Sequence, residues 1–233
     1  MVPFIPLLAG VFWGAPLLAR EYERNTHQLA WTQSVGRGHW LAVKFGVLAG
    51  CAMLAGLASG QMFGAWLDMF PGKAESFAET SYFGALGVAP AAWWLFAFTL
   101  GTAAGVLVRK TLPAIAITVA VFLAAAIALL LRPHYAEPVR TLGPDAATKG
   151  ALIVKLGRVT PDGREMSSLD NVPGCPVGIG KSACALAAGY QDFTVYQPVD
   201  RFWRFQWTEA GILLAATAVL GGVAVGGTVR RRR

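Results

Sequence analysis

The chain has 233 residues, of which 55% are hydrophobic and only 14% are charged, and its mean hydropathy is +0.50. About a quarter of the residues in an ordinary soluble domain are charged, so this composition excludes most soluble folds and predicts a protein of the lipid bilayer. The chain carries 20 lysines and arginines against 13 acids, a net charge of +7. In a soluble protein that charge would suggest a nucleic-acid partner, so its meaning depends on where the basic residues lie.

Five apolar stretches have the length needed to cross a hydrocarbon core about 30 Å thick, which takes roughly 17 to 25 residues. Because backbone amides find no water in lipid, each stretch is predicted to be an α-helix. The membrane part is therefore expected to be an all-α polytopic bundle surrounded by lipid. None of the stretches contains Asp, Glu, Lys or Arg, so ion-coupled transport is not indicated. The stretches are Val2–Ala19, Phe45–Leu67, Gly84–Val108, Leu112–Leu131 and Ala210–Val229.

The first stretch has a second interpretation, as a secretory signal peptide. It lacks a basic region before its apolar part, and the flank Arg20–Arg24 is strongly charged instead of offering small residues for cleavage. A retained helix is therefore the favoured interpretation. Pro16 removes one intrahelical hydrogen bond, which predicts a kink near Gly14.

The basic residues predict how the helices are oriented. If the segment Arg20–Lys44 is cytoplasmic, strict alternation of the helices places ten basic residues of the short flanks on that side. The short outer loop Gln61–Phe83 contains one, Lys73. By the positive-inside rule the N-terminus is outside and the basic tail Arg230–Arg233 is cytoplasmic. The net charge is thus mostly a topology signal, and no nucleic-acid partner is expected.

The long segment Arg132–Trp207 is predicted to be a small extracytoplasmic subdomain. Within it, Ala151–Val159 is a strand candidate, Thr160–Gly163 has the residues of a tight turn, and Arg164–Leu169 can return as the second strand of a β-hairpin. The extended run Phe193–Tyr196 is a further strand candidate. The aromatic and basic residues just before the last stretch are typical of the headgroup region.

Two of the three cysteines, Cys175 and Cys184, lie in this outer segment and are predicted to form a disulfide, which would stabilise so short a loop by roughly 2.5 kcal/mol. Two unrelated thiols are the alternative. Cys51 is interpreted as an apolar filler within a helix. The run Gly174–Ser182 resembles a phosphate-binding loop but has Cys175 where the motif needs its first Gly. No catalytic residue, metal site or cofactor is expected.

Glycines recur at four-residue spacing in the apolar stretches, a pattern that lets helices approach closely in lipid. The second stretch has most of them and is predicted to form a crowded helix interface, either within the chain or between two subunits. Its glycines at this spacing are Gly46, Gly50, Gly56, Gly60 and Gly64.

The segment Arg20–Lys44 mixes acids with apolar residues and is interpreted as a docking element. Its acids follow the C-terminal end of a helix, where they oppose the helix dipole and call for a compensating partner. Neutralisation by Arg20 and Arg24 is the simpler alternative. The residues assigned to docking are Glu21, Glu23, Arg24, Thr26, Leu29 and Trp31.

In this segment the sequence resembles the membrane subunits of type-2 ABC exporters. There a membrane helix ends in a Glu-x-Glu-x-Gly-Thr pattern and runs into a coupling helix that contacts the ATPase. Glu21, Glu23 and Thr26 match that pattern, whereas Asn25 stands in place of Gly. Because Asn tolerates positive φ better than most residues, the departure is mild.

Further phrases are similar to permeases common in high-GC actinobacteria: Val11–Glu21, Leu29–Val35, and the aromatic run within Tyr196–Trp207. Those permeases have six membrane helices and a cytoplasmic N-terminus, whereas nothing here precedes the helix equivalent to their second. The sequence therefore predicts either that Met1 is a misassigned start or that the chain is a truncated member.

The resemblance implies a permease subunit of an ABC exporter in a bacterial plasma membrane. It would work with a separate ATPase subunit that hydrolyses ATP and with a second permease subunit, identical or different, and would not be an enzyme itself. The alternative is a non-transporting integral membrane protein, an orphan or truncated subunit that binds or regulates partners. A membrane-embedded hydrolase is disfavoured, because His27, His39 and His134 show no nucleophile or metal spacing around them.

Overall fold

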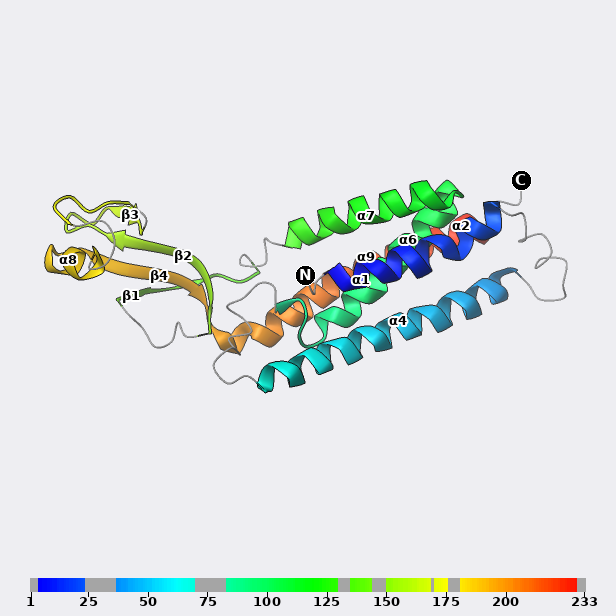
Figure 1. Ribbon diagram of the computed structural model, residues 1–233, viewed down its shortest axis with the longest axis horizontal. Coiled ribbons are helices and arrows are strands. Elements are labelled where there is room, and N and C mark those ends of the chain that lie inside the picture. The colour runs from blue at the N-terminus through cyan, green and yellow to red at the C-terminus, as the bar shows by residue number, and fades with distance from the viewer. Residues whose placement is uncertain are drawn as a thin grey trace.

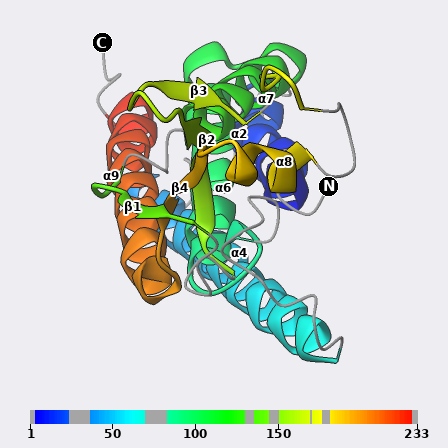
Figure 2. The ribbon, with the colours of Figure 1, turned by 90° about the vertical axis from the view of Figure 1, so that its left-hand side faces the viewer.

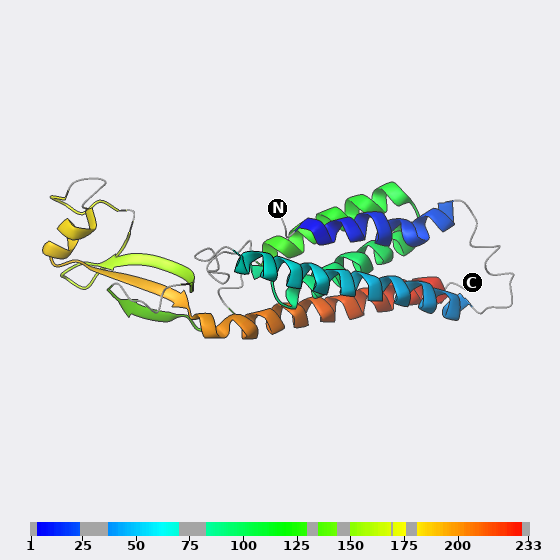
Figure 3. The same cartoon turned by 60° about the horizontal axis from the view of Figure 1, so that its bottom comes forward.

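The computed structural model divides the chain into a long helical bundle and a small β-sheet that lies beyond one end of it (Figure 1). The helices run along the long axis of the molecule, and the sheet projects past them (Figure 3). The structure describes residues 4–23, 37–69, 83–129, 135–143, 150–168, 170–175 and 181–229.

Each of the five predicted apolar stretches contains a helix, although the third becomes helical only at Ala89. The elements are α1 (Ile5–Leu8), η2 (Ala9–Gly14), α2 (Ala15–Glu23), α4 (Arg37–Asp68), α6 (Ala89–Val108), α7 (Thr111–Ala128) and α9 (Phe202–Val229). By length and composition, four helices in the described parts of the chain can cross a membrane: Ala42–Asp68, Ala89–Val108, Thr111–Ala128 and Val199–Thr228. The expected all-α membrane part with about five helices is confirmed.

The first predicted stretch is one helical run that changes its hydrogen-bonding pattern. In η2 the backbone winds as a π-helix, and the N–H of Ala15 donates to the carbonyl of Gly10. Pro16 follows directly, and its ring nitrogen has no hydrogen to donate. At the point where the sequence predicted a kink, the structure shows a π-helical segment, which is one of the recognised sites of helix bending.

Helix α6 is the centre of the bundle. Of its most apolar 18-residue window 78% is buried, against 11% for α4 and 17% for α7. The other helices surround it, as the view along the bundle shows (Figure 2). Its aromatic residues Trp93 and Phe96 pack with Phe122 of α7 in the largest core cluster.

Glycines bring the first helical run against α6 almost backbone to backbone. A Cβ atom placed on Gly101 would lie 2.2 Å from the carbonyl oxygen of Gly10, and one placed on Gly14 would lie 2.3 Å from that of Phe98. Gly105 faces the carbonyl of Ala15 in the same way, at 2.7 Å. These contacts leave no room for a side chain on either helix.

The predicted packing glycines of α4 divide into two groups. Gly56 and Gly60 lie against the start of α6, where a Cβ would come within 2.7 Å of Ala91 and 2.9 Å of Gly87 respectively. Gly64 makes an ordinary contact with Leu86. Gly46 and Gly50 have no heavy atom within 4 Å of a Cβ position, so they pack against no described part of this chain.

The sheet confirms the predicted hairpin and adds two strands to it. Its strands are β1 (Val139–Leu142), β2 (Leu152–Val159), β3 (Glu165–Ser167) and β4 (Gln191–Gln197), all antiparallel in the order β1-β4-β2-β3. Gly163 takes a φ of +80° in the β2–β3 turn, a conformation that favours glycine. The candidate strand Phe193–Tyr196 lies inside β4, whereas β1 was not predicted. Cys175 forms a disulfide with Cys184, which lies within the short helix α8 (Lys181–Ala187).

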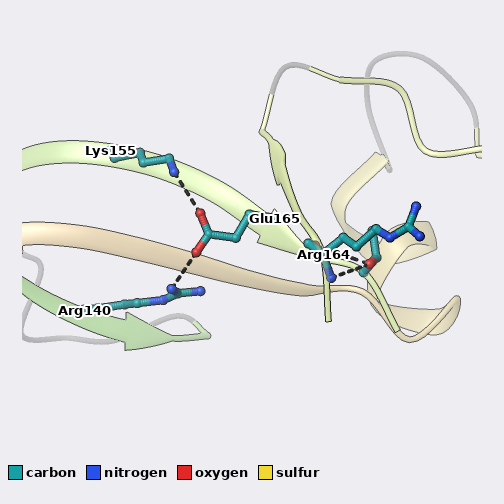
Figure 4. A network of polar contacts seen from close by, with 5 residues as sticks. Arg140, Lys155, Arg164 and Glu165 are labelled. Carbon is teal, nitrogen blue, oxygen red and sulfur yellow. Dashed lines mark hydrogen bonds and ion pairs between the residues drawn. The ribbon is translucent and has the colours of Figure 1, made fainter. Parts of the chain in front are cut away.

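The carboxylate of Glu165, on β3, bonds side chains of two other strands, β1 and β2, across one face of the sheet. Glu165 accepts hydrogen bonds from Lys155 Nζ at 2.8 Å and from Arg140 Nη1 at 2.6 Å (Figure 4). The Arg140 guanidinium also lies 4.2 Å from the centre of the buried Phe193 ring. The hydrogen bond from Lys155, followed by that from Arg140, holds the pKa of Glu165 below its ordinary value.

Gly101→Ala is expected to destabilise the bundle, because the new methyl group would meet backbone atoms that cannot rotate away. Overpacking of this kind typically lowers the free energy of unfolding by about 1–3 kcal/mol. Gly222→Ala in α9 is the matched control, since no atom of the described residues lies within 4 Å of its Cβ position. Thermal unfolding of the purified protein in detergent should show a lower Tm for Gly101→Ala alone. Equal Tm values for the two variants would contradict the close approach.

The Glu165 network should make stability depend on pH. Because the folded-state pKa is lowered, its contribution is present above the ordinary pKa of a glutamate and is lost as the pH falls through the lowered value. Glu165→Gln removes this dependence. The Tm difference between parent and variant should therefore shrink from neutral to strongly acidic pH. A difference that stays constant over that range would show that the ionised carboxylate contributes nothing.

Candidate coupling site

The end of the bundle opposite the sheet brings five helix termini together. The C-terminal ends of α2, α6 and α9 and the N-terminal ends of α4 and α7 lie there (Figure 1). Two of the predicted docking residues, Glu21 and Glu23, occupy the last turn of α2. The candidate site is built from this turn and from the two helix starts beside it.

Glu21 connects α2 to α4. Its Oε1 atom forms an ion pair with Lys44 Nζ, and both side chains are partly buried. Lys44 belongs to the first turns of α4, which begins at Arg37 and is therefore helical earlier than the apolar stretch indicates. The contact holds the last turn of α2 beside α4.

Glu23 connects α2 to α7 through a single residue. The backbone N–H of Thr111 donates to Glu23 Oε1 at 2.9 Å, and the Thr111 hydroxyl donates to Glu23 Oε2 at 2.7 Å. Thr111 is the first residue of α7, so its N–H has no partner within its own helix. The carboxylate thus serves as the N-cap of a helix that lies elsewhere in the sequence.

The turn between α6 and α7 explains why α7 needs an external cap. It contains only Arg109, at a φ of 58°, and Lys110. The N–H of Arg109 donates to the carbonyl of Gly105 and closes α6. Lys110 occupies the N-cap position of α7 and makes no capping hydrogen bond, because an ammonium group has no acceptor. Glu23 supplies the missing acceptor and places negative charge at the positive end of the α7 dipole.

The structure therefore gives the two acids partners inside the chain. Among the described residues these partners are Lys44 and the start of α7, while the alternative of neutralisation by Arg20 and Arg24 stays a prediction, because Arg24 lies outside the described residues. Sequence reasoning missed Lys44 and Thr111 because they lie 23 and 88 residues from their acidic partners. The other predicted docking residues, Arg24, Thr26, Leu29 and Trp31, lie outside the described residues.

A second buried polar cluster lies between α6 and α9, toward the sheet. Gln206 accepts from the N–H of Ala89 at 2.9 Å and donates to the carbonyl of Phe83 at 2.8 Å. One turn further along, Glu209 accepts from Trp93 Nε1 at 2.8 Å and is fully buried. Helix α9 begins at Phe202, before the predicted apolar stretch, and therefore includes Glu209.

The same early start of α9 changes the interpretation of the residues before the last apolar stretch. Trp203 and Trp207 are exposed on the helix, as the headgroup prediction requires, but Phe205 and Gln206 are completely buried. Within the described residues no three His, Cys, Asp or Glu side chains are grouped to hold a metal ion.

Residues 1–132, more than half of the chain, match the family described as ABC-2 membrane transporter related. The match covers the first four predicted membrane stretches and the candidate site, while the sheet and α9 lie beyond it. Comparisons with curated proteins and with solved structures gave no significant match. The chain therefore belongs to the ABC-2 membrane transporter related family and is a multi-pass, permease-like membrane component of a transporter, which implies partnership with an ABC ATPase.

Proposed function

We propose that this chain is the membrane-spanning subunit of an ABC exporter and that residues 20–44 couple it to a separate ATPase subunit. The observation that carries the proposal is a pair of contacts made by the last turn of α2, where the α2–α4 connection begins. Glu21 binds Lys44 and Glu23 binds Thr111, so the connection starts from a turn fixed to two membrane helices. A displacement of the connection by a partner would reach the bundle directly, which is what coupling between two sites requires.

The coupling end is proposed to face the cytoplasm, where an ATPase binds its nucleotide. Basic residues support this orientation, since Arg20, Arg109 and Lys110 are exposed at this end and Lys44 lies beside them. The sheet would then lie outside, where an oxidising environment suits the Cys175–Cys184 disulfide. The C-terminus of α9 would be cytoplasmic.

A second permease subunit, identical or different, is proposed to complete the transport path. The outward faces of two helices support such an assembly, because no described part of the chain lies against Gly46 and Gly50 of α4 or Gly222 and Gly226 of α9. Small residues on a lipid-exposed face permit close helix contacts. Bulky apolar side chains are also exposed on these two helices and on α7, and they suit lipid; examples are Leu54, Val219 and Leu112.

The orientation predicts the labelling of single cysteines in intact cells, in a Cys51→Ala background. Gly163→Cys, in the exposed β2–β3 turn, should react with a membrane-impermeant thiol reagent. Gly36→Cys, in the connection between α2 and α4, should react only after the membrane is permeabilised. The reverse pattern would overturn the orientation.

The coupling role predicts that an ABC ATPase copurifies with the tagged full-length chain from the membranes of its source cell. The ATPase is identified by mass spectrometry, and its ATP turnover should rise when the chain is present. A chain in which residues 24–36 are replaced by a Gly/Ser linker of equal length is the control, and it should fold but neither retain nor stimulate the ATPase. Recovery of the parent chain without any ABC ATPase would contradict the proposed function.

A further inference from the structure

The structure assigns to Glu23 a role inside the permease, and we propose that it is a positioning residue which caps α7 and transmits movement of the α2–α4 connection to that helix. The inference rests on the proposed function, since the movement is attributed to an ATPase. It differs from the docking role predicted from the sequence, in which the Glu23 carboxylate contacts the ATPase itself.

First, the Glu23 carboxylate is directed toward α7 inside the chain. Both of its oxygens accept hydrogen bonds from Thr111, one from the backbone N–H and one from the hydroxyl. A carboxylate held by two bonds to one residue has a fixed position relative to α7. Binding the ATPase through the same oxygens would compete with this cap.

The second argument is that α7 has few other polar contacts by which to follow α2. Its buried residues are Ala114, Thr118 and Phe122, and the Thr118 hydroxyl donates to the carbonyl of Ala114 within the same helix. Apolar packing allows one helix to slide on another, whereas a capping hydrogen bond fixes the position along the axis. Glu23 is thus placed to make α7 follow α2 lengthwise.

The third argument is that α6 cannot take the same role. Its backbone lies against η2 at Gly101 and against the start of α2 at Gly105, with no room for a side chain between them. The α6–α7 turn has only two residues and includes the left-handed Arg109. A pull on Thr111 therefore acts at the junction between a fixed helix and a lightly packed one.

Glutamine separates capping from docking. Glu23→Gln keeps an oxygen acceptor for the Thr111 N–H and a group that can bond the hydroxyl, but it removes the charge that a basic ATPase surface would need. Under the capping role Glu23→Gln should stay within about twofold of the parent in ATPase stimulation, while Glu23→Ala should lose about fivefold or more, the usual range of coupling between sites. Under a docking role both variants should fail equally.

The experiment uses the full chain together with the ABC ATPase that copurifies with it. For each variant we would measure the amount of ATPase retained, the stimulation of ATP turnover, and hydrogen exchange at the first-turn amides of α7, with and without ATP and vanadate. Glu23→Ala should retain the ATPase yet lose both stimulation and protection of the Thr111 amide. Thr111→Ser should behave as the parent, and Thr111→Val should be impaired.

A double variant and a control variant complete the experiment. Glu23→Ala combined with Thr111→Val should be no worse than Glu23→Ala alone, because the two residues act through one contact. Thr208→Val is the matched control, since that hydroxyl bonds only the carbonyl of Arg204 within α9 among its described contacts. Loss of ATPase retention in both Glu23 variants, or unchanged stimulation in Glu23→Ala, would overturn the capping role.

Failure of the proposed function would look different. The parent chain would then retain no ABC ATPase, while the protection of the Thr111 amide and its loss in Glu23→Ala would still report on the cap. Protection that is equal in the parent and in Glu23→Ala would overturn the cap even if the ATPase partnership holds.

Discussion

Close backbone contact between η2 and α6 is the constraint on which the rest of the bundle depends. Carbonyl groups of one helix lie where a side chain of the other would have to be, and only glycine permits this at Gly101 and Gly14. In lipid there is no hydrophobic force between helices, so packing and polar contacts must hold them together. With α6 enclosed, α4, α7 and α9 keep broad faces that the described residues do not cover.

Two helices of this bundle receive their N-terminal caps from other helices. At one end Gln206 of α9 accepts from the N–H of Ala89, the first residue of α6. At the opposite end Glu23 of α2 accepts from Thr111, the first residue of α7. The local N-cap residues, Val88 and Lys110, make no capping bond of their own. In a membrane an unsatisfied amide is costly, so each cap also fixes which helix must lie beside which.

The sequence shows the helices and the hairpin because their signals are local. An apolar run of membrane length or a Pro-Asp-Gly turn can be identified from neighbouring residues alone. The edge strand β1 has no such signal in Val139–Leu142 and exists through its pairing with β4. The early start of α9 escaped prediction for a related reason. Gln206 and Glu209 lie just before the last apolar stretch in the sequence, where polar side chains suggest that the helix has not yet begun. In the structure they accept hydrogen bonds from Ala89 and Trp93 of α6.

The partners of the α2 acids could not be predicted by considering that helix alone. A carboxylate in the last turn of a helix opposes that helix's own dipole, and from the sequence alone its compensation is expected from an external partner or from neighbouring arginines. Helix α7 runs antiparallel to α2, so the C-terminal end of α2 lies beside the N-terminal end of α7 (Figure 1). The negative charge of Glu23, which destabilises the C-terminal end of α2, therefore stabilises the N-terminal end of α7. This stabilisation is lost if the two helix ends move apart. The electrostatic free energy of the Glu23 carboxylate therefore depends on the position of α2 relative to α7, which is the property that a coupling contact needs.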